Sequence, residues 1–306
     1  MEEYKDCWQG RNDGQEALSQ RLFQVVNFEA KDEMDFVIHG FAVDEGVRRN
    51  KGRVGAAEAP NYIRRALANF PVVQSGFNLH DFGNIYCRDA DLELAQASLA
   101  KAVCQALEVG AKSVVLGGGH EVTWGHYQGI RMAHPEKTIG VINFDAHFDN
   151  RTPEKEGYGT SGTGFWQIAK QDALQSLHIG IQRNSNTLSL FDSAHQLGMK
   201  YILAEEIDLI NLPDIKTQIQ EFSHSVDLLY LTICMDVFNA SIAPGVSALA
   251  YNGIMSDSVF LRLLRTVLDC PNLVALDVAE VNPQLDIQDR TSRLAASLVN
   301  EWFMSL

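Results

Sequence analysis

The sequence lacks long hydrophobic runs and an excess of positive charge. No apolar stretch approaches the roughly 18 residues that a helix needs to cross a bilayer, so no membrane span is expected. Only 25 lysines and arginines stand against 39 aspartates and glutamates, which gives a formal net charge of −14. Such a charge repels nucleic-acid phosphates and anionic lipid. We therefore expect no nucleic-acid partner and no membrane partner.

Cysteines are few, and their number is odd. The five cysteines form no C-x-x-C pair and no disulfide-like spacing, which suits a reducing compartment. The first residues, MEEYKD, are acidic and polar, so they lack the basic and apolar regions of a secretory signal. Both absences favour a cytoplasmic location.

The chain has ample material for a folded core. Its 306 residues are 46% hydrophobic, which excludes intrinsic disorder and a small disulfide-stapled scaffold. No repeat, low-complexity tract or linker divides it, so a single domain is expected over 1–306.

Short apolar runs alternate with longer amphipathic segments, a pattern typical of α/β folds. The runs 114–116 and 139–142 are continuously apolar, which indicates strands covered on both faces and hence a parallel sheet between helical layers. The predicted strands are 36–43, 80–86, 113–116, 139–144, 177–181, 201–204, 228–234 and 273–278. The predicted helices are 60–69, 91–109, 124–134, 187–197, 214–222 and 256–268.

Potential metal ligands follow several of these strands. Asp145, His147 and Asp149 alternate directly after 139–144, so in extended backbone their side chains point the same way. Two carboxylates and an imidazole favour Mn²⁺ or Mg²⁺. A solvated acidic turn is the alternative, but His120 follows another strand, and the carboxyl ends of parallel strands meet at one edge of the sheet.

The glycines before His120 have two interpretations. A tight turn from strand to helix is one; a phosphate-binding loop is the other, but the G-K-[ST] continuation is missing. His126, in the helix that follows, is expected to be an ordinary packed or surface histidine.

Four motifs, in order along the chain, resemble those of the ureohydrolases, the arginase and agmatinase superfamily of binuclear manganese hydrolases. They are Gly118–His120, Asp145–Asp149, Thr232–Asp236 running on to Ala243–Gly245, and Glu280–Pro283. The resemblance covers nearly the whole chain. It implies the arginase-type three-layer fold, a single domain with a central, mainly parallel eight-stranded sheet and with residues 1–30 as an N-terminal extension packed on it. The extension's Trp8–Asp13 either closes a pocket or simply packs.

Within the superfamily, further motifs resemble the branch that hydrolyses N-formimidoyl-L-glutamate to L-glutamate and formamide in histidine degradation. These motifs are Trp8–Arg11, Gly46–Ala56, Ser161–Thr163 and Gly245–Ala248. The substrate is thus expected to be a small dicarboxylate amidine. Because trimers and hexamers are common in the superfamily, a homo-oligomer is one implied arrangement.

The resemblance also implies the role of each motif residue at a two-manganese centre. His120 and Asp149 would bind one Mn²⁺, His147 and Asp236 the other, and Asp145 would bridge them. A hydroxide between the ions would be the nucleophile. Glu280 would hold the amidinium of the substrate.

The implied substrate contacts are polar or cationic. Arg151 and Arg183 would bind the substrate carboxylates, although surface salt bridges are the alternative for both. Ser161 stands where arginases carry a histidine proton shuttle. Asn50 and Arg53 belong to the motif 46–56 and complete the expected contacts.

One metal position departs from the family pattern. Cys234 occupies the place of a bridging aspartate, and a thiolate is a soft ligand, poorly matched to Mn²⁺. Three outcomes are open: a redox-sensitive active centre with Cys234 as a ligand, one weakly held or missing ion, or a metal-poor pseudoenzyme. Another amidino or guanidino hydrolase, acting on agmatine or guanidinobutyrate, is the alternative activity.

Overall fold

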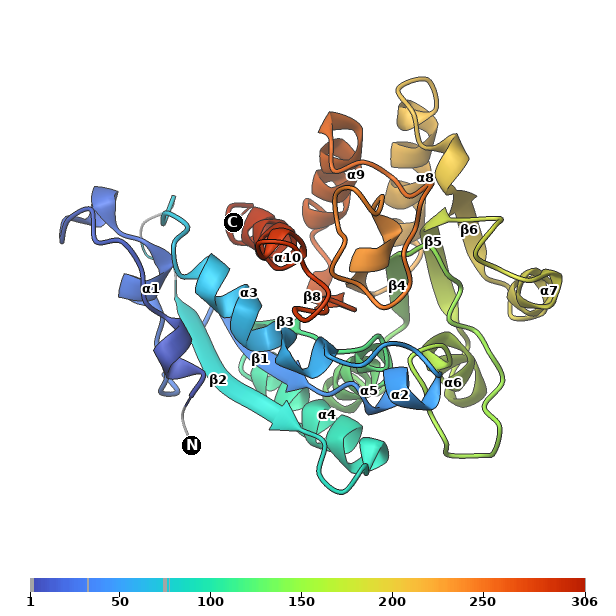
Figure 1. Ribbon diagram of the computed structural model, residues 1–306, viewed down its shortest axis with the longest axis horizontal. Helices are drawn as coiled ribbons and strands as arrows, with labels where there is room; N and C mark the ends of the chain where they lie inside the picture. The colour runs from blue at the N-terminus through green and yellow to red at the C-terminus, as the bar shows by residue number, and fades with distance from the viewer. Residues whose placement is uncertain (1–2, 32, 74–75, 77, 306) are drawn as a thin grey trace.

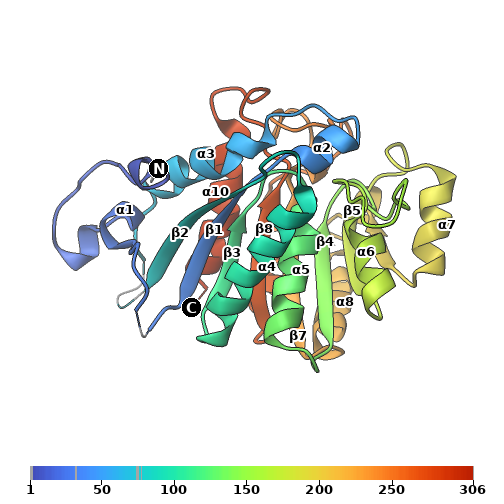
Figure 2. The ribbon, with the colours of Figure 1, turned by 90° about the horizontal axis from the view of Figure 1, so that it is seen from below.

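A single sheet of eight strands runs through the protein (Figures 1 and 2). The computed structural model describes residues 3–31, 33–73, 76 and 78–305. The strand order is β2-β1-β3-β8-β7-β4-β5-β6, and all neighbours pair in parallel. The strands are β1 (Phe36–Ala42), β2 (Leu79–Tyr86), β3 (Lys112–Leu116), β4 (Ile139–Phe144), β5 (Gln175–Ile181), β6 (Lys200–Leu203), β7 (Leu228–Cys234) and β8 (Leu273–Ala279). The predicted strands and the predicted three-layer architecture are confirmed.

Helices cover both faces of the sheet (Figure 2). One layer contains α3 (Ala59–Leu67), α8 (Leu212–His224), α9 (Ser258–Leu268) and α10 (Arg290–Phe303). The opposite layer contains α4 (Leu92–Glu108), α5 (Val122–Ala133) and α6 (Gly164–Gln171). The remaining α-helices are α1 (Leu22–Val25), α2 (Glu45–Arg49) and α7 (Leu188–Gln196). The amphipathic segments of the sequence predicted α3, α4, α5, α7, α8 and α9 to within a few residues, whereas α1, α2, α6 and α10 were not predicted.

A separate hydrophobic core fills the space on each side of the sheet. In β3, Val114 and Leu116 belong to the core under α3, α8, α9 and α10, whereas Val115 belongs to the core under α4, α5 and α6. Strand β4 divides in the same way, with Ile142 on the first side and Val141 on the second. Successive side chains of both strands enter different cores, and this is why the two strands are continuously apolar.

The N-terminal segment packs against the edge of the sheet that β2 forms. The Trp8 indole is buried and donates a hydrogen bond to Asp81 Oδ2 at 2.7 Å. Arg64 of α3 holds the same carboxylate with Nε 2.6 Å and Nη2 2.8 Å away. Of the two interpretations of Trp8, packing against the sheet edge is therefore correct and closure of a pocket is not.

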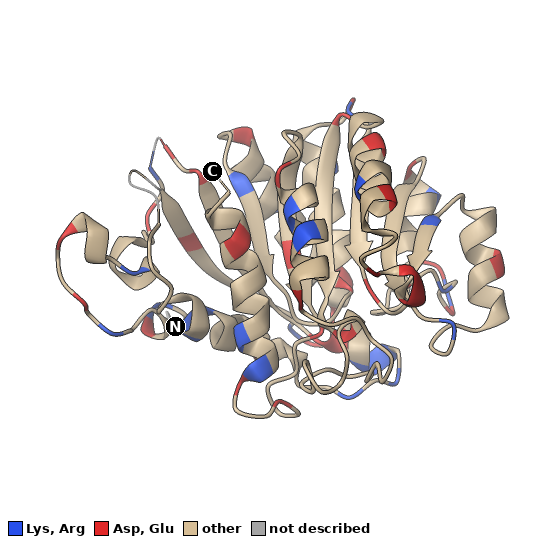
Figure 3. Cartoon of the chain, turned by 90° about the horizontal axis from the view of Figure 1, so that it is seen from above, with Lys and Arg blue, Asp and Glu red and all other residues tan. Residues whose placement is uncertain are grey.

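Charged residues gather on the helices and loops, and the strands carry few of them (Figure 3). Within the described residues, no helix has both the length and the apolar character to span a membrane.

Candidate metal centre

Four neighbouring strands bring the predicted ligands to one edge of the sheet. In the strand order, β3, β8, β7 and β4 are adjacent, and their carboxyl ends lead to His120, Glu280, Cys234 and Asp145 respectively. The tight turn at Gly118 contributes, because a Cβ there would collide with the carbonyl oxygen of Val43. Residues more than 100 positions apart along the chain therefore meet in a single site.

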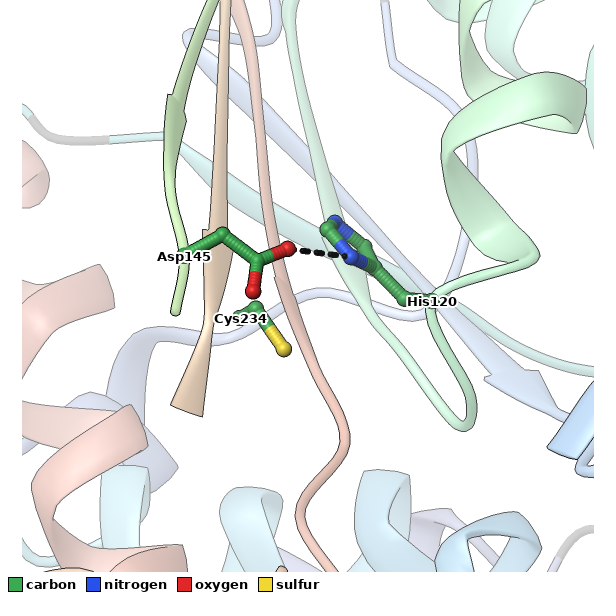
Figure 4. Close-up of side chains that lie close together, drawn as sticks. All are labelled: His120, Asp145 and Cys234. Atoms are coloured by element: carbon green, nitrogen blue, oxygen red, sulfur yellow. Dashed lines mark ion pairs between the residues drawn. The ribbon is translucent and has the colours of Figure 1, made fainter. Parts of the chain in front are cut away.

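The first ligand cluster consists of His120, Asp145 and Cys234. One ligand atom from each of the three lies within 4.8 Å of the others, and all three side chains are buried (Figure 4). His120 Nδ1 is 3.0 Å from Asp145 Oδ2. Cys234 thus lies where its sulfur could contact an ion held by His120 and Asp145.

The second cluster shares Asp145 with the first and adds His147 and Asp236, again within 4.8 Å. His147 Nδ1 is 3.2 Å from Asp236 Oδ2 and 3.5 Å from Asp145 Oδ1. Asp145 therefore presents Oδ2 to His120 and Oδ1 to His147. A carboxylate with one oxygen in each cluster has the arrangement of a bridging ligand.

Asp149 joins the first cluster. Its Oδ2 is 2.8 Å from His120 Nδ1. Its backbone has φ +46°, a left-handed conformation that residues other than glycine adopt infrequently. Such strain persists where the surrounding structure imposes it and is frequent at functional sites.

The two clusters concentrate buried negative charge. Burial, reinforced by Asp145, raises the pKa of the Asp149 carboxyl. Burial and the nearby carboxylates also raise the pKa of the Cys234 thiol well above its ordinary range. For His120 and His147, the carboxylates outweigh the lowering effect of burial and raise the imidazole pKa well above its ordinary value. A divalent cation would relieve the repulsion between these groups.

The donor set fits divalent cations. Asp236 Oδ1 is buried and has no hydrogen-bond partner among the described residues, although buried carboxylate oxygens normally have one. Imidazole nitrogens and carboxylate oxygens suit Mn²⁺, whereas the sulfur of Cys234 suits softer ions better.

A cavity of about 260 Å³ opens above the clusters. Its lining is Val47, Asn50, Gly52, His147, Asp149, Arg151, Ser161, Ser185, Leu190, Cys234, Asp236, Ser247, Ala248 and Glu280. Among these lining residues, Arg151 is the only lysine or arginine. The cavity therefore has ligand-type side chains in one part and a guanidinium in another.

Glu280 enters the cavity from the end of β8. Its backbone has φ +66°, and its Oε1 accepts a hydrogen bond from the His120 backbone N–H at 2.9 Å. Burial, with Glu121 and Asp236 nearby, raises the pKa of the Glu280 carboxyl well above its usual range. The carboxyl is thus held in place, and no lysine or arginine of the described residues forms an ion pair with it, so a cationic ligand could supply this partner.

Asn50, Arg151 and Ser161 form a polar group in the cavity wall. Asn50 Nδ2 donates to Ser161 Oγ at 3.2 Å, and the Arg151 backbone N–H donates to the Gly162 carbonyl at 2.9 Å. A Cβ at Gly162 would be 3.2 Å from Asn50 Nδ2 and 3.3 Å from Arg151 Cδ. The absent side chain of Gly162 therefore lets this polar group assemble.

Two of the arginines expected to contact the substrate lie elsewhere. Arg183 is not in the cavity lining; its Nε pairs with Glu205 at 2.9 Å, and both side chains are mostly exposed. Arg53 is also outside the lining, because its guanidinium donates to the carbonyls of Val246 and Ser247. Arg53 therefore fixes the loop that carries Ser247, whereas Arg183 forms the surface salt bridge that was the alternative interpretation.

Thr232 is a site residue that the sequence analysis missed. Its Oγ1 lies 3.0 Å from His120 Nε2, on the side of the ring opposite the carboxylates. A signal was available, because Thr232 and Cys234 are two residues apart in β7 and so point to the same face.

The chain is similar to known proteins of one family. The model of the Arginase family matches residues 34–305. A formimidoylglutamase of Aliivibrio fischeri is 42% identical over 325 residues, which cover 95% of this chain and 92% of the relative. A formimidoylglutamase of Staphylococcus carnosus is 39% identical, with 97% of each protein covered.

Solved structures share the fold. The crystal structure of formimidoylglutamase from Bacillus subtilis has a TM-score of 0.85 at 23% identity and covers 94% of this chain and 91% of the other. The structure of Trypanosoma cruzi formiminoglutamase with Mn²⁺ has a TM-score of 0.84 at 24% identity, covering 94% and 98%. From the family match and the identity to its relatives, this chain belongs to the arginase family.

Proposed function

We propose that this protein hydrolyses N-formimidoyl-L-glutamate to L-glutamate and formamide with the help of two Mn²⁺ ions. The observation that carries the proposal is a pair of ligand clusters that share Asp145 and open into a cavity containing Arg151. The formimidoylglutamases that are 42% and 39% identical to this chain support the choice of substrate.

The chain's own residues would hold the ions. His120, Asp145 and Asp149 would bind one Mn²⁺, with Cys234 next to it, and His147, Asp145 and Asp236 would bind the other. Bound in this way, a pair of divalent ions lowers the pKa of water and so supplies a hydroxide nucleophile near neutral pH. Because Asp145 contacts both clusters, it would set the spacing between the ions.

Glu280 would orient the reacting end of the substrate. An amidinium is planar and cationic, and it pairs well with a carboxylate through charge-assisted hydrogen bonds. The hydrogen bond from the His120 N–H fixes Oε1 of Glu280, so the carboxylate would hold the amidine carbon at a constant place relative to the metal ligands. Such positioning lowers the entropic part of the barrier.

Arg151 would bind the carboxylate end of the substrate. A guanidinium matches a carboxylate in shape and charge, and Asn50 and Ser161 lie beside it to donate further hydrogen bonds. The same guanidinium disfavours agmatine, whose far end is a cationic amine. Agmatine is therefore disfavoured by charge, whereas guanidinobutyrate, which also ends in a carboxylate, is disfavoured only by the similarity of this chain to formimidoylglutamases.

We also propose that residues 1–306 form one domain, with residues 1–30 as an extension packed against it. The buried contact of Trp8 with Asp81 and Arg64 supports this arrangement.

The test is glutamate release from N-formimidoyl-L-glutamate by metal-free protein reconstituted with Mn²⁺ under reducing conditions. Arginine and agmatine are run in parallel, and chelator-treated protein is the control. We expect turnover of the first substrate alone and loss of turnover with chelator. Turnover of arginine or agmatine instead would refute the substrate. No turnover of any of the three would refute the activity, and the Cys234→Asp protein would then show whether the cysteine is the cause.

A further inference from the structure

A chain of buried hydrogen bonds continues behind the metal centre, on the side of His120 that faces away from the carboxylates. His120 Nε2 is 3.0 Å from Thr232 Oγ1, and Thr232 Oγ1 is 2.6 Å from Asp277 Oδ1. All three side chains are buried, and neither Thr232 nor Asp277 lines the cavity.

Asp277 is held from its other side by Tyr230 of β7 and His126 of α5. Its Oδ2 accepts hydrogen bonds from the Tyr230 hydroxyl and from His126 Nδ1, the latter at 2.8 Å. The His126 ring packs on Tyr230 with centroids 4.8 Å apart, and its Nε2 is 3.0 Å from Ser113 Oγ. His126, predicted to be an ordinary histidine, therefore belongs to a network that reaches the metal centre.

The hydrogen bonds that link His120, Thr232 and Asp277 can run in only one consistent direction. The Tyr230 hydroxyl and His126 Nδ1 lie at Asp277 Oδ2, and the Thr232 hydroxyl donates to Asp277 Oδ1, so Asp277 is the acceptor of these contacts. The single proton of the Thr232 hydroxyl is therefore donated to Asp277, so Thr232 Oγ1 must accept from His120 Nε2–H. With Nε2 protonated, His120 turns Nδ1 toward Asp145 and Asp149, where a metal ion would be bound.

We propose that Asp277, Thr232 and His126 are positioning residues that fix the ring of His120 so that Nδ1 faces the metal ion. This inference rests on the proposed function, because it needs the metal centre. A hydrogen bond to the far nitrogen of a metal-bound imidazole fixes its tautomer and orientation. His126 and Tyr230 hold the Asp277 carboxylate, and Thr232 transmits its position to His120.

The main test is Thr232→Val, which removes the hydroxyl with almost no change of shape. Thr232→Ser keeps the hydroxyl, and Thr266→Val is the matched control. Thr266 is also a buried threonine, but its hydroxyl donates to the Arg262 carbonyl within α9. The primary readout is the Mn²⁺ dissociation constant of each metal-free protein, measured without substrate by the EPR signal of free Mn²⁺.

We expect Thr232→Val to weaken Mn²⁺ binding at the site that contains His120 by roughly 10- to 100-fold. This is the usual effect of losing the hydrogen-bond partner of a metal ligand. Thr232→Ser and Thr266→Val should keep the parent affinity. At saturating Mn²⁺, KM should be the same for all of them, since Thr232 does not contact the substrate. A Thr232→Val protein that is folded and binds Mn²⁺ like the parent would overturn the proposal.

A second pair of variants tests His126. Asparagine can place an N–H where Nδ1 lies, whereas leucine cannot, so His126→Asn should bind Mn²⁺ more tightly than His126→Leu. Equal affinities would remove His126 from the proposal.

These measurements separate this inference from the proposed function. Parent protein that binds Mn²⁺ but does not release glutamate contradicts the proposed reaction, and the variant affinities still decide the positioning role. Parent protein that binds no Mn²⁺ contradicts both.

Discussion

Replacing Arg151 with glutamine should weaken substrate binding while leaving the metal centre intact. Arg151 is the only lysine or arginine among the residues that line the cavity. Glutamine keeps most of the length and the hydrogen-bonding capacity of the side chain but removes the charge. The backbone of Arg151 would still donate to the Gly162 carbonyl, so the loop should keep its conformation.

The size of the effect follows from the type of contact. A hydrogen bond to a charged group contributes about 1.5–3 kcal/mol, which corresponds to a factor of about 10 to 150 in an equilibrium constant. Arg151 is exposed, so solvent screens the contact and the lower end of the range applies. We expect kcat/KM to fall by about tenfold, mostly through KM, because the guanidinium binds the substrate and the transition state alike.

The assay is glutamate release over a range of N-formimidoyl-L-glutamate concentrations at saturating Mn²⁺. Arg183→Gln is the matched control, because Arg183 was also predicted to bind a substrate carboxylate but lies outside the cavity and pairs with Glu205. Its kinetic constants should equal those of the parent. An equal loss in both variants, or a loss only in Arg183→Gln, would refute the assignment of Arg151.

Three further predictions concern Cys234, a buried ion pair and a buried histidine. If Cys234 is a metal ligand, an oxidant should lower manganese content and activity together and a thiol reductant should restore both; activity that responds to neither would exclude this role. Arg64→Ala should lower the free energy of unfolding by about 3–5 kcal/mol, because it leaves the fully buried Asp81 carboxylate without its cation. Arg265→Ala, at a pair whose arginine is exposed to solvent, should cost about 1 kcal/mol or less in the same urea titration. Burial lowers the pKa of His39 from 6.5 to about 4. The unfolded chain therefore takes up a proton at this residue below about pH 6.5, whereas the folded chain takes it up only below about pH 4. Stability should thus fall as the pH drops through this interval, by up to about 3 kcal/mol from this group, and His39→Leu should reduce that fall; equal slopes in parent and variant would contradict the argument.

Most of the sheet, and the gathering of the candidate metal ligands at one of its edges, could be predicted from the sequence. Strands β3 and β4 lie between two cores, so their sequences are continuously apolar, and that local signal predicted a parallel sheet. The ligands follow the strands directly, so their convergence at one edge of the sheet also followed from local sequence. Helices α6 and α10 were missed although both have an amphipathic pattern.

The contacts of the cavity wall could not be predicted. Arg151 and Arg183 are chemically equivalent in the sequence, and only the placement of their loops puts one in the cavity and the other beside Glu205. Arg53 belongs to a family-like motif, yet its guanidinium holds backbone carbonyls of the loop around Ser247.

The sequence by itself determined the fold class, the order of the strands along the chain and the edge of the sheet at which the candidate metal ligands gather, because apolar periodicity and strand ends are local properties. Only the tertiary structure decided which strands are neighbours. Strands β3 and β4 are separated in the sheet by β8 and β7, and this order places His120, Asp145 and Cys234 within 4.8 Å of one another. It also connects His126 to the metal centre through Asp277 and Thr232. Contacts of this kind depend on how distant strands pair, and strand pairing minimises the free energy of the whole core instead of that of any single segment.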